Sequence, residues 1–262
     1  MKESLVSKIQ QLSSVEYETL QELDGPSGTL RVRQAGNYRW LQMDDASVQS
    51  LVDVNAPHRV LSPSIVLMLM GLAFTSGRER LLNLGLGGGA IERGLCAFAP
   101  SLSVSSVEVD PRVVAVSKEH FFLPTEQTIH EQDAEQFIAN ESGYYDLVLC
   151  DLFKDDQLPA CTSRGSFFAD IERCLSPGGV FVINLLHTDQ AALVSTLHAV
   201  RAYLPVTWLV EIKGHQNVIA YFTREQASST ELKAACGDIL QTLEAEPLTF
   251  EWELVSLPVR KP

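Results

Sequence analysis

The sequence predicts an α/β protein in which helices cover both faces of a mostly parallel β-sheet, preceded by a small antiparallel β unit. From Arg80 onward, apolar strand-like runs alternate with helical patterns, which is typical of such a sheet. A glycine-rich turn over Gly85–Gly89 joins the first of these strands to a helix. With 262 residues, 45% of them hydrophobic, the chain is long enough for one large domain and one small domain.

Residues 1–60 are predicted to form the small β domain. Its strand-like runs are Val15–Leu20, Thr29–Val32, Tyr38–Met43 and Val48–Val52. Short turn sequences such as Gly36-Asn37 separate them, and connections of this kind join antiparallel strands. Residues 61–262 are predicted to form the second, nucleoside-binding domain. This domain begins with an apolar helix over Ser64–Phe74.

Seven strands are predicted in the large domain. They are Leu81–Leu84, Ser103–Val109, Thr128–Glu131, Tyr145–Cys150, Gly179–Leu185, Thr207–Lys213 and Asn217–Arg224. The helices are Ile91–Phe98, Pro111–Phe121, Ala134–Asn140, Phe167–Cys174, Asp189–Arg201 and Thr230–Glu244. The last two strands must pair antiparallel, because the three residues between them are too few for a parallel crossover. This layout resembles the class I S-adenosylmethionine-dependent methyltransferase-like (Rossmann-like) fold.

The glycine turn is the strongest local signal of a ligand site. Gly85, Gly87 and Gly89 lack a Cβ, so the chain can turn sharply there and a ligand can approach the backbone. The following helix directs free N–H groups and a partial positive charge at this point. The spacing alone suits either a dinucleotide or an S-adenosylmethionine-type nucleoside.

Acidic residues follow three successive strands and favour the nucleoside. In such sheets, ligands bind outside the carboxyl ends of the strands, where the strand order reverses. Glu108 lies 23 residues after Gly85, where a carboxylate would accept the ribose hydroxyls. Asp133 would accept the adenine amino group, and Asp151 lies beside the glycine turn. Together with the turn they predict an adenosine site.

Five segments, in this order, resemble the spermidine synthase (polyamine aminopropyltransferase) family and, more distantly, class I methyltransferases. They are LNLGLGGGAIERGL, SSVEVDPRVVAVSKEHF, EQDAEQFI, YYDLVLCDLF and CLSPGGVFVINL. The resemblance implies a homodimer and a sulfonium co-substrate, either decarboxylated S-adenosylmethionine or S-adenosylmethionine, with no metal. It also implies that Glu108 binds the ribose, that Asp133 binds the adenine and that Asp151 lies near the reacting centre. Gln49, in MDDASVQSL, matches the family's N-terminal glutamine near the nucleoside.

The sequence departs from the family around the amine substrate. Where the synthases read D-S-S-D-P, this chain has Asp151-Leu152-Phe153-Lys154-Asp155-Asp156, with Lys154 at the second aspartate position. A one-residue bulge would bring Asp155 into place, so Asp151 and Asp155 are the candidate catalytic residues. Gly88 replaces the glycine-loop aspartate, and Val54–Pro63 lacks the family's acidic segment. The nucleoside half of the site is thus kept, and the amine half is changed.

The composition of the chain indicates which kinds of partner it would bind. The formal net charge of −13 argues against nucleic acid and suits a cationic small molecule such as a polyamine. No apolar run reaches membrane-spanning length and the N-terminus lacks a signal-peptide pattern, so we expect no membrane partner and a cytoplasmic protein. The five scattered cysteines predict neither a disulfide framework nor a zinc site.

Three functional hypotheses remain open from the sequence. The first is a spermidine synthase-like aminopropyltransferase with a divergent acceptor site. The second is an S-adenosylmethionine-dependent small-molecule methyltransferase, because Lys154 and Arg59 suit an anionic acceptor better than a polyamine. The third is a non-catalytic nucleoside- or polyamine-binding protein, motivated by the missing acidic residues.

Overall fold

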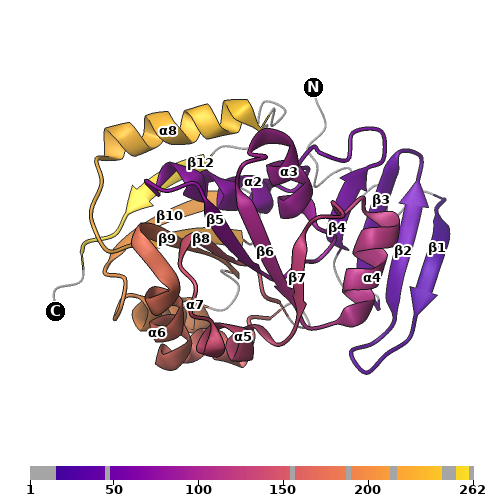
Figure 1. Ribbon diagram of the computed structural model, residues 1–262, viewed down its shortest axis with the longest axis horizontal. Helices are drawn as coiled ribbons and strands as arrows, with labels where there is room; N and C mark the ends of the chain where they lie inside the picture. The colour runs from indigo at the N-terminus through magenta and orange to yellow at the C-terminus, as the bar shows by residue number, and fades with distance from the viewer. Residues whose placement is uncertain are drawn as a thin grey trace.

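A small antiparallel sheet and a large mixed sheet lie side by side in the computed structural model (Figure 1). The structure describes residues 16–44, 48–153, 157–186, 190–212, 217–243 and 252–259. The small sheet has the order β1-β2-β3-β4, and each strand pairs antiparallel with the next. Its strands are β1 (Glu18–Leu23), β2 (Leu30–Ala35), β3 (Tyr38–Met43) and β4 (Val48–Asp53). The predicted N-terminal β unit is therefore present in the structure.

The large sheet has the order β12-β10-β11-β9-β8-β5-β6-β7. The strands from β9 to β7 run parallel, whereas β11, β10 and β12 pair antiparallel. They are β5 (Arg80–Leu84), β6 (Ser103–Glu108), β7 (Thr128–Glu131), β8 (Tyr145–Cys150), β9 (Leu175–Leu186), β10 (Val206–Ile212), β11 (Asn217–Thr223) and β12 (Trp252–Ser256). The predicted fold class is confirmed, including the antiparallel β10–β11 pair.

The sheet has one strand more than the seven predicted from the sequence. β12 pairs antiparallel with β10, from Trp208 opposite Ser256 to Ile212 opposite Trp252. Its run of five residues buries Leu254 and leaves Glu253 and Val255 exposed. Such a short alternating run after a helix gives little periodic signal, and only its pairing with β10 makes it a strand.

Helices cover both faces of the large sheet (Figure 1). They are α2 (Pro63–Leu69), α3 (Ala90–Phe98), α4 (Pro111–His120), α5 (Ala134–Asn140), α6 (Gly165–Cys174), α7 (Gln190–Val200) and α8 (Ser229–Thr242), with short 3-10 helices η1 (Met70–Ala73) and η2 (Ala160–Ser163). Residues of α2, α3 and α8 share one apolar cluster with Leu81, and residues of α5 and α6 share another with Leu82. Neighbouring residues of β5 therefore enter opposite cores, as expected for a strand buried on both faces.

The small sheet packs on α4 through a third apolar cluster. Leu30, Val32 and Leu41 of the sheet meet Val113 and Val116 of α4. β4 ends at residue 53 and α2 begins at residue 63, so the predicted domain boundary at residue 60 falls between the two sheets. This packing puts β4 next to the glycine turn.

The helices and the cysteines give two further observations. None of the helices in the described ranges is long and apolar enough to cross a membrane. All five cysteines are free thiols; four are buried and Cys96 is exposed. The cysteines therefore behave as unlinked side chains, most of them within the core.

A buried tyrosine links β11 to α2 and gives a test of this packing. The Tyr221 hydroxyl donates to the Leu67 carbonyl oxygen at 2.6 Å, and its ring stacks on Phe74 with centroids 4.5 Å apart. We expect Tyr221→Phe to lower the free energy of unfolding by about 1 kcal/mol, the net value of one such hydrogen bond. The melting temperature should fall by about 2–4 °C.

Tyr144→Phe is the matched control, because Tyr144 is 62% exposed. Thermal unfolding followed by circular dichroism would compare the two variants with the parent protein. Equal melting temperatures for Tyr221→Phe and Tyr144→Phe would contradict a structural role for the hydrogen bond.

Candidate active site

The glycine loop, residues 85–89, makes the closest backbone approach in the site. Gly85, Gly87 and Gly89 have φ values of +100°, +51° and +70°, a region that favours glycine. A methyl group on Gly85 would lie 2.5 Å from the carbonyl oxygen of Asp151. The loop can therefore close against the end of β8 only because residue 85 has no side chain.

Backbone hydrogen bonds hold this loop between the strands that flank β5. Gly85 N–H donates to the Val107 carbonyl oxygen at 2.9 Å, and Asp151 N–H donates to the Leu84 carbonyl oxygen at 2.9 Å. Gly89 is the N-cap residue of α3. The loop thus lies where β6 and β8 diverge from β5, the position at which sheets of this kind bind ligands.

Glu108 ends β6 and accepts hydrogen bonds from the glycine loop. Its carboxylate oxygens accept from Leu86 N–H at 3.2 Å and from Asp110 N–H at 3.0 Å. Burial raises the pKa of Glu108, and these backbone hydrogen bonds oppose that rise. The structure therefore brings Glu108 and the glycine loop together, as the sequence predicts.

Asp133 lies at the same end of the sheet, one strand further out. It is the N-cap residue of α5 and accepts from Gln136 N–H at 3.0 Å. Its neighbour Gln132 donates its N–H to the Glu108 carbonyl oxygen at 3.0 Å. Asp133 is exposed, so its carboxylate is accessible at the end of β7, and its contact with an adenine stays a prediction.

Asp151 follows β8 and is held by a row of two amides. Asn184 of β9 donates its Nδ2 hydrogen to Asp151 Oδ1 at 2.8 Å, and Asn217 of β11 donates to Asn184 Oδ1 at 2.9 Å. Burial raises the pKa of Asp151, and the Asn184 hydrogen bond opposes that rise. The arrangement fixes one carboxylate oxygen of a residue that takes up a proton more readily than an ordinary aspartate.

Sequence reasoning missed Asn184 and Asn217. The available signal is a polar residue inside the apolar run of β9, where Asn184 is only 4% exposed. A buried amide needs partners, which marks it as part of a polar network. The identity of those partners depends on the pairing of β8, β9 and β11 and cannot be read from one strand.

On β4, Ser50 rather than Gln49 contacts the glycine loop. Gly88 N–H donates to Ser50 Oγ at 3.1 Å. Consecutive β3 residues Leu41 and Gln42 pair with Ser50 and Val48, so Gln49 is the extra residue of a β-bulge. Gln49 is exposed, and its proposed contact with the nucleoside stays a prediction.

Gly88 occupies a position with little room for the aspartate found in the family. A Cβ there would lie 2.6 Å from Ser50 Oγ and 3.1 Å from a ring carbon of Phe121. Both neighbours would have to move before any side chain could be accommodated. Ser50 of the small sheet therefore occupies part of the space that the family aspartate would need at residue 88.

A buried arginine ties the loop to the segment that differs most from the family. Arg93 of α3 donates to the carbonyl oxygens of Pro57 and Phe121, both at 2.8 Å, and to that of Gly88. Burial lowers the pKa of Arg93 to about 10 and raises the pKa of the neighbouring Glu92. Arg93 thus links the glycine loop to the segment that contains Pro57, where the spermidine synthase family has its acidic residues.

Asp155 lies outside the described residues, together with Lys154 and Asp156. Its catalytic role therefore stays a prediction, whereas Asp151 is described in full. Among the residues that the structure describes, no group of three or more His, Cys, Asp or Glu side chains is arranged to hold a metal ion.

Sequence comparisons relate the chain to two kinds of transferase. A family model described as a methyltransferase domain matches residues 82–183. A polyamine aminopropyltransferase from Chromobacterium violaceum is 30% identical over 164 residues, which is 62% of this chain and 63% of that protein. The human eEF1A lysine and N-terminal methyltransferase is 28% identical over 68% of this chain, but over only 28% of its own length. The chain thus matches less than two thirds of the length of these relatives.

Two solved structures share the fold of this chain. A probable spermidine synthase from Corynebacterium glutamicum has a TM-score of 0.75 at 20% identity, covering 89% of this chain and 90% of that one. Human methyltransferase-like protein 13, solved in complex with SAH, has a TM-score of 0.65 at 25% identity, covering 70% and 93%. Their agreement on the fold supports the methyltransferase-like assignment.

The fold is of the methyltransferase-like, Rossmann-like class. The relatives within this class are transferases, as predicted from the sequence. In sequence, the chain is similar to polyamine aminopropyltransferases at about 30% identity, as the resemblance of its motifs predicts.

The contact at Gly85 predicts a large effect of one methyl group. We expect Gly85→Ala to abolish nucleoside binding and to destabilise the fold by about 1–3 kcal/mol, because the positive φ and the Asp151 carbonyl both oppose a Cβ. Gly36→Ala is the matched control, since Gly36 has φ +54° but open space around it. Chemical denaturation and calorimetry with methylthioadenosine would measure both quantities. Equal losses in the two variants would contradict the close approach.

The raised pKa of Asp151 predicts that its charge destabilises the fold. The folded protein binds this proton more tightly than the unfolded chain, so stability is lost as the pH rises through the pKa of the folded carboxyl. Asp151→Asn keeps an oxygen for Asn184 and removes that charge. We expect its melting temperature to exceed that of the parent at pH 8, by a margin that vanishes well below the ordinary aspartate pKa of about 3.9.

Asp238→Asn on the exposed face of α8 serves as the control and should leave the melting temperature unchanged. A melting temperature for Asp151→Asn below that of the parent at pH 8 would contradict the burial argument.

Proposed function

We propose that the chain is a transferase that moves an aminopropyl group from decarboxylated S-adenosylmethionine to an amine acceptor. The carrying observation is Asp151, a half-buried residue at the end of β8 whose carboxyl group Asn184 holds beside the glycine loop. An amine attacks carbon only in its neutral form and must lose a proton as it does so. A positioned carboxylate of raised pKa is suited to accept that proton.

The described residues fit an adenosine ligand. Glu108 offers two carboxylate oxygens at the end of β6, where the ribose hydroxyls would donate. Val109, 65% exposed next to Glu108, offers an apolar surface on which an adenine face would pack. Among the described residues, the nearest atom to a Cβ built on Gly87 is Ser50 Oγ at 3.9 Å, so a ligand can approach the Cα of this residue.

When bound, the sulfonium nucleoside supplies an electrophilic carbon and a good leaving group. The remaining work belongs to the side chains of this protein. Asn184 donates to one oxygen of Asp151 and leaves the other for the acceptor amine. Asn217 orients the Asn184 amide, because it donates to the amide oxygen and so directs the NH2 group towards Asp151.

The names of the relatives favour an amine acceptor in either kind of reaction. One group is named for polyamine aminopropyl transfer, the other for methylation of a lysine and an N-terminus. The net charge of −13 would attract a cationic acceptor such as a polyamine. The cytoplasmic location and the homodimer expected from the sequence stay predictions.

Methyl transfer from S-adenosylmethionine is the second candidate, and one observation favours it. Ser50 and Phe121 fill the space next to Gly88 in which the family aspartate would meet the ammonium tail of decarboxylated S-adenosylmethionine. Without that carboxylate, the site lacks one interaction that would favour decarboxylated S-adenosylmethionine over S-adenosylmethionine.

The two reactions can be separated by one experiment. Purified protein would be titrated by calorimetry with S-adenosylmethionine and with its decarboxylated form, and then incubated with each of them and a panel of diamines and polyamines. Mass spectrometry of the products distinguishes an added aminopropyl group from a methyl group. We expect aminopropyl transfer that Asp151→Asn reduces by a factor of about 10²–10⁴, with nucleoside binding retained.

Asp238→Asn should keep full turnover. Methylated products alone would select the second candidate. Tight nucleoside binding without turnover on any amine would instead support the non-catalytic binding protein and reject both reactions.

A further inference from the structure

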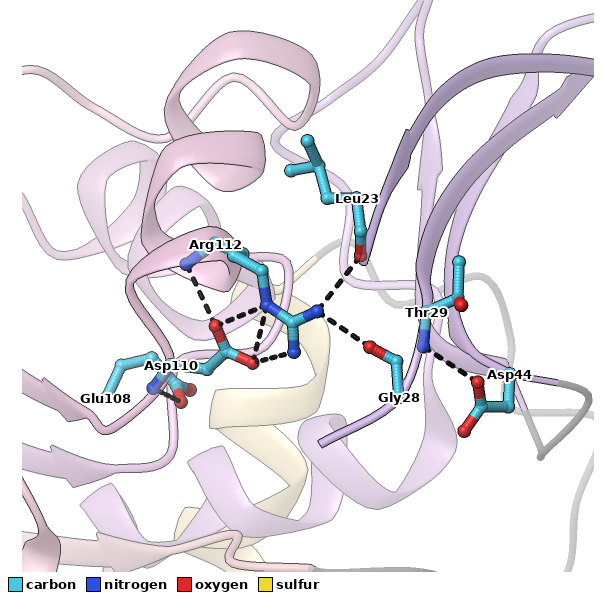
Figure 2. Close-up of polar contacts among 7 residues, drawn as sticks. All are labelled: Leu23, Gly28, Thr29, Asp44, Glu108, Asp110 and Arg112. Carbon is cyan, nitrogen blue, oxygen red and sulfur yellow. Dashed lines mark hydrogen bonds and ion pairs between the residues drawn. The ribbon is translucent and has the colours of Figure 1, made fainter. Parts of the chain in front are cut away.

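Arg112, in the first turn of α4, joins the small sheet to the loop that follows β6 (Figure 2). Its Nη1 donates to the carbonyl oxygens of Leu23 at 2.9 Å and Gly28 at 2.7 Å, one on each side of the β1–β2 turn. Its Nε and Nη2 donate to the two oxygens of Asp110 at 3.0 and 2.6 Å. A single guanidinium thus binds two backbone oxygens of the small sheet and a carboxylate of the large domain.

The β1–β2 turn is shaped around this guanidinium. A Cβ on Gly25 would lie 2.4 Å from the central carbon of the Arg112 guanidinium, so a side chain at residue 25 would displace the guanidinium from this position. Asp44 holds the far side of the turn, because Thr29 N–H donates to its carboxylate at 2.7 Å (Figure 2). Gly28 N–H closes the turn on the Gly25 carbonyl oxygen at 3.0 Å. The turn therefore presents its carbonyl oxygens to Arg112 in a fixed geometry.

The ion pair between Arg112 and Asp110 is largely removed from water. Their side chains are 15% and 13% exposed, and the contact is bidentate, a geometry stronger than that of a single contact. Arg112 lowers the pKa of Asp110, and Asp110 raises that of Arg112, so both remain charged over the working range of pH.

Asp110 also connects this pair to the nucleoside site. Asp110 N–H donates to Glu108 Oε1 at 3.0 Å, while its carboxylate caps α4 by accepting from Arg112 N–H at 2.9 Å. One short segment, residues 108–110, therefore carries the candidate ribose ligand and the partner of Arg112. A shift of the Asp110 backbone would move a hydrogen bond that orients Glu108.

We propose that Arg112 is a positioning residue that couples the docking of the β1–β2 turn to occupancy of the adenosine site at Glu108. The inference rests on the proposed function, because it takes an adenosine nucleoside as the ligand. Coupling of this kind is reciprocal: if docking of the turn favours nucleoside binding, the nucleoside must favour docking by the same factor.

Other contacts keep the small sheet attached when Arg112 is changed. The apolar cluster between β2, β3 and α4 does not include it. Arg39 donates to the His120 carbonyl oxygen at 2.5 Å, and His120 Nε2 lies 2.8 Å from Gln21 Oε1. Arg112→Met should therefore fold with the sheet in place while the turn loses its link to residues 108–110.

The test compares Arg112→Met with Arg33→Met in the full chain. Arg33 is a matched control, because it lies on β2, bonds Gln42 and packs over Tyr17, all within the N-terminal part of the chain. Calorimetry would measure the affinity for methylthioadenosine, and hydrogen exchange would follow residues 23–30 with and without this nucleoside. Arg112→Lys, which keeps the charge but not the planar fork, is the second variant.

We expect methylthioadenosine to slow exchange in residues 23–30 of the parent and of Arg33→Met. In Arg112→Met the slowing should disappear and binding should weaken by about tenfold, within the usual range of such coupling. The affinity and the slowing of exchange in Arg112→Lys should lie between those of the parent and those of Arg112→Met. This variant therefore tests the coupling even if the methionine variant is unfolded.

Two results would overturn the coupling alone: bound nucleoside that leaves exchange in residues 23–30 of the parent unchanged, or Arg112 variants that keep both the slowing and the parent affinity. A parent protein that binds no methylthioadenosine would overturn the proposed function and, with it, the coupling. The affinity of the parent protein therefore distinguishes the two failures.

Discussion

The contact between Gly85 and the Asp151 carbonyl oxygen is the constraint on which the rest of the site depends. A Cβ at residue 85 would come within 2.5 Å of that oxygen, so the loops after β5 and β8 can meet only through bare backbone. This contact sets where Asp151 leaves the strand and hence where its carboxylate meets Asn184. It also brings Leu86 N–H within reach of Glu108 on the other side. The backbone of the glycine loop therefore positions both Glu108, the candidate nucleoside ligand, and Asp151, the candidate group for the acceptor.

The small N-terminal sheet forms the second wall of the site, and the divergence of the chain is concentrated there. Ser50 of β4 receives the Gly88 N–H, and Arg93 binds the segment after β4 through Pro57. Gly88 and the segment over Val54–Pro63 are also the two places, besides the loop after Asp151, where the sequence departs from the spermidine synthase family. The candidate nucleoside ligands Glu108 and Asp133 lie at strand ends of the large sheet, where the parallel register fixes them. Two of the three departures from the family thus lie along this wall.

Much of the fold could be predicted from the sequence, because its signals are local. Strands buried on both faces appear as short apolar runs, and the glycine loop and the acidic strand ends follow directly from the chain order. The contact of Ser50 could not be predicted, because the bulge at Gln49 changes which β4 residue faces the loop. Asn217 and Arg112 were missed for a related reason. Their partners lie 33 and 89 residues away in the chain, at distances that no periodic pattern encodes.

The strand β12, which was not predicted from the sequence, affects whether two copies of the chain can pair through the edges of their large sheets. A β-sheet that ends in a long, unpaired, apolar strand is a template for pairing between chains. β10 carries the buried Trp208 and Val210, and β12 covers its outer edge with five residues that include the exposed Glu253. At the opposite edge, β7 is only four residues long and exposes Thr128 and Glu131. Both margins of the large sheet are thus short and bear a carboxylate, which discourages self-association by strand addition.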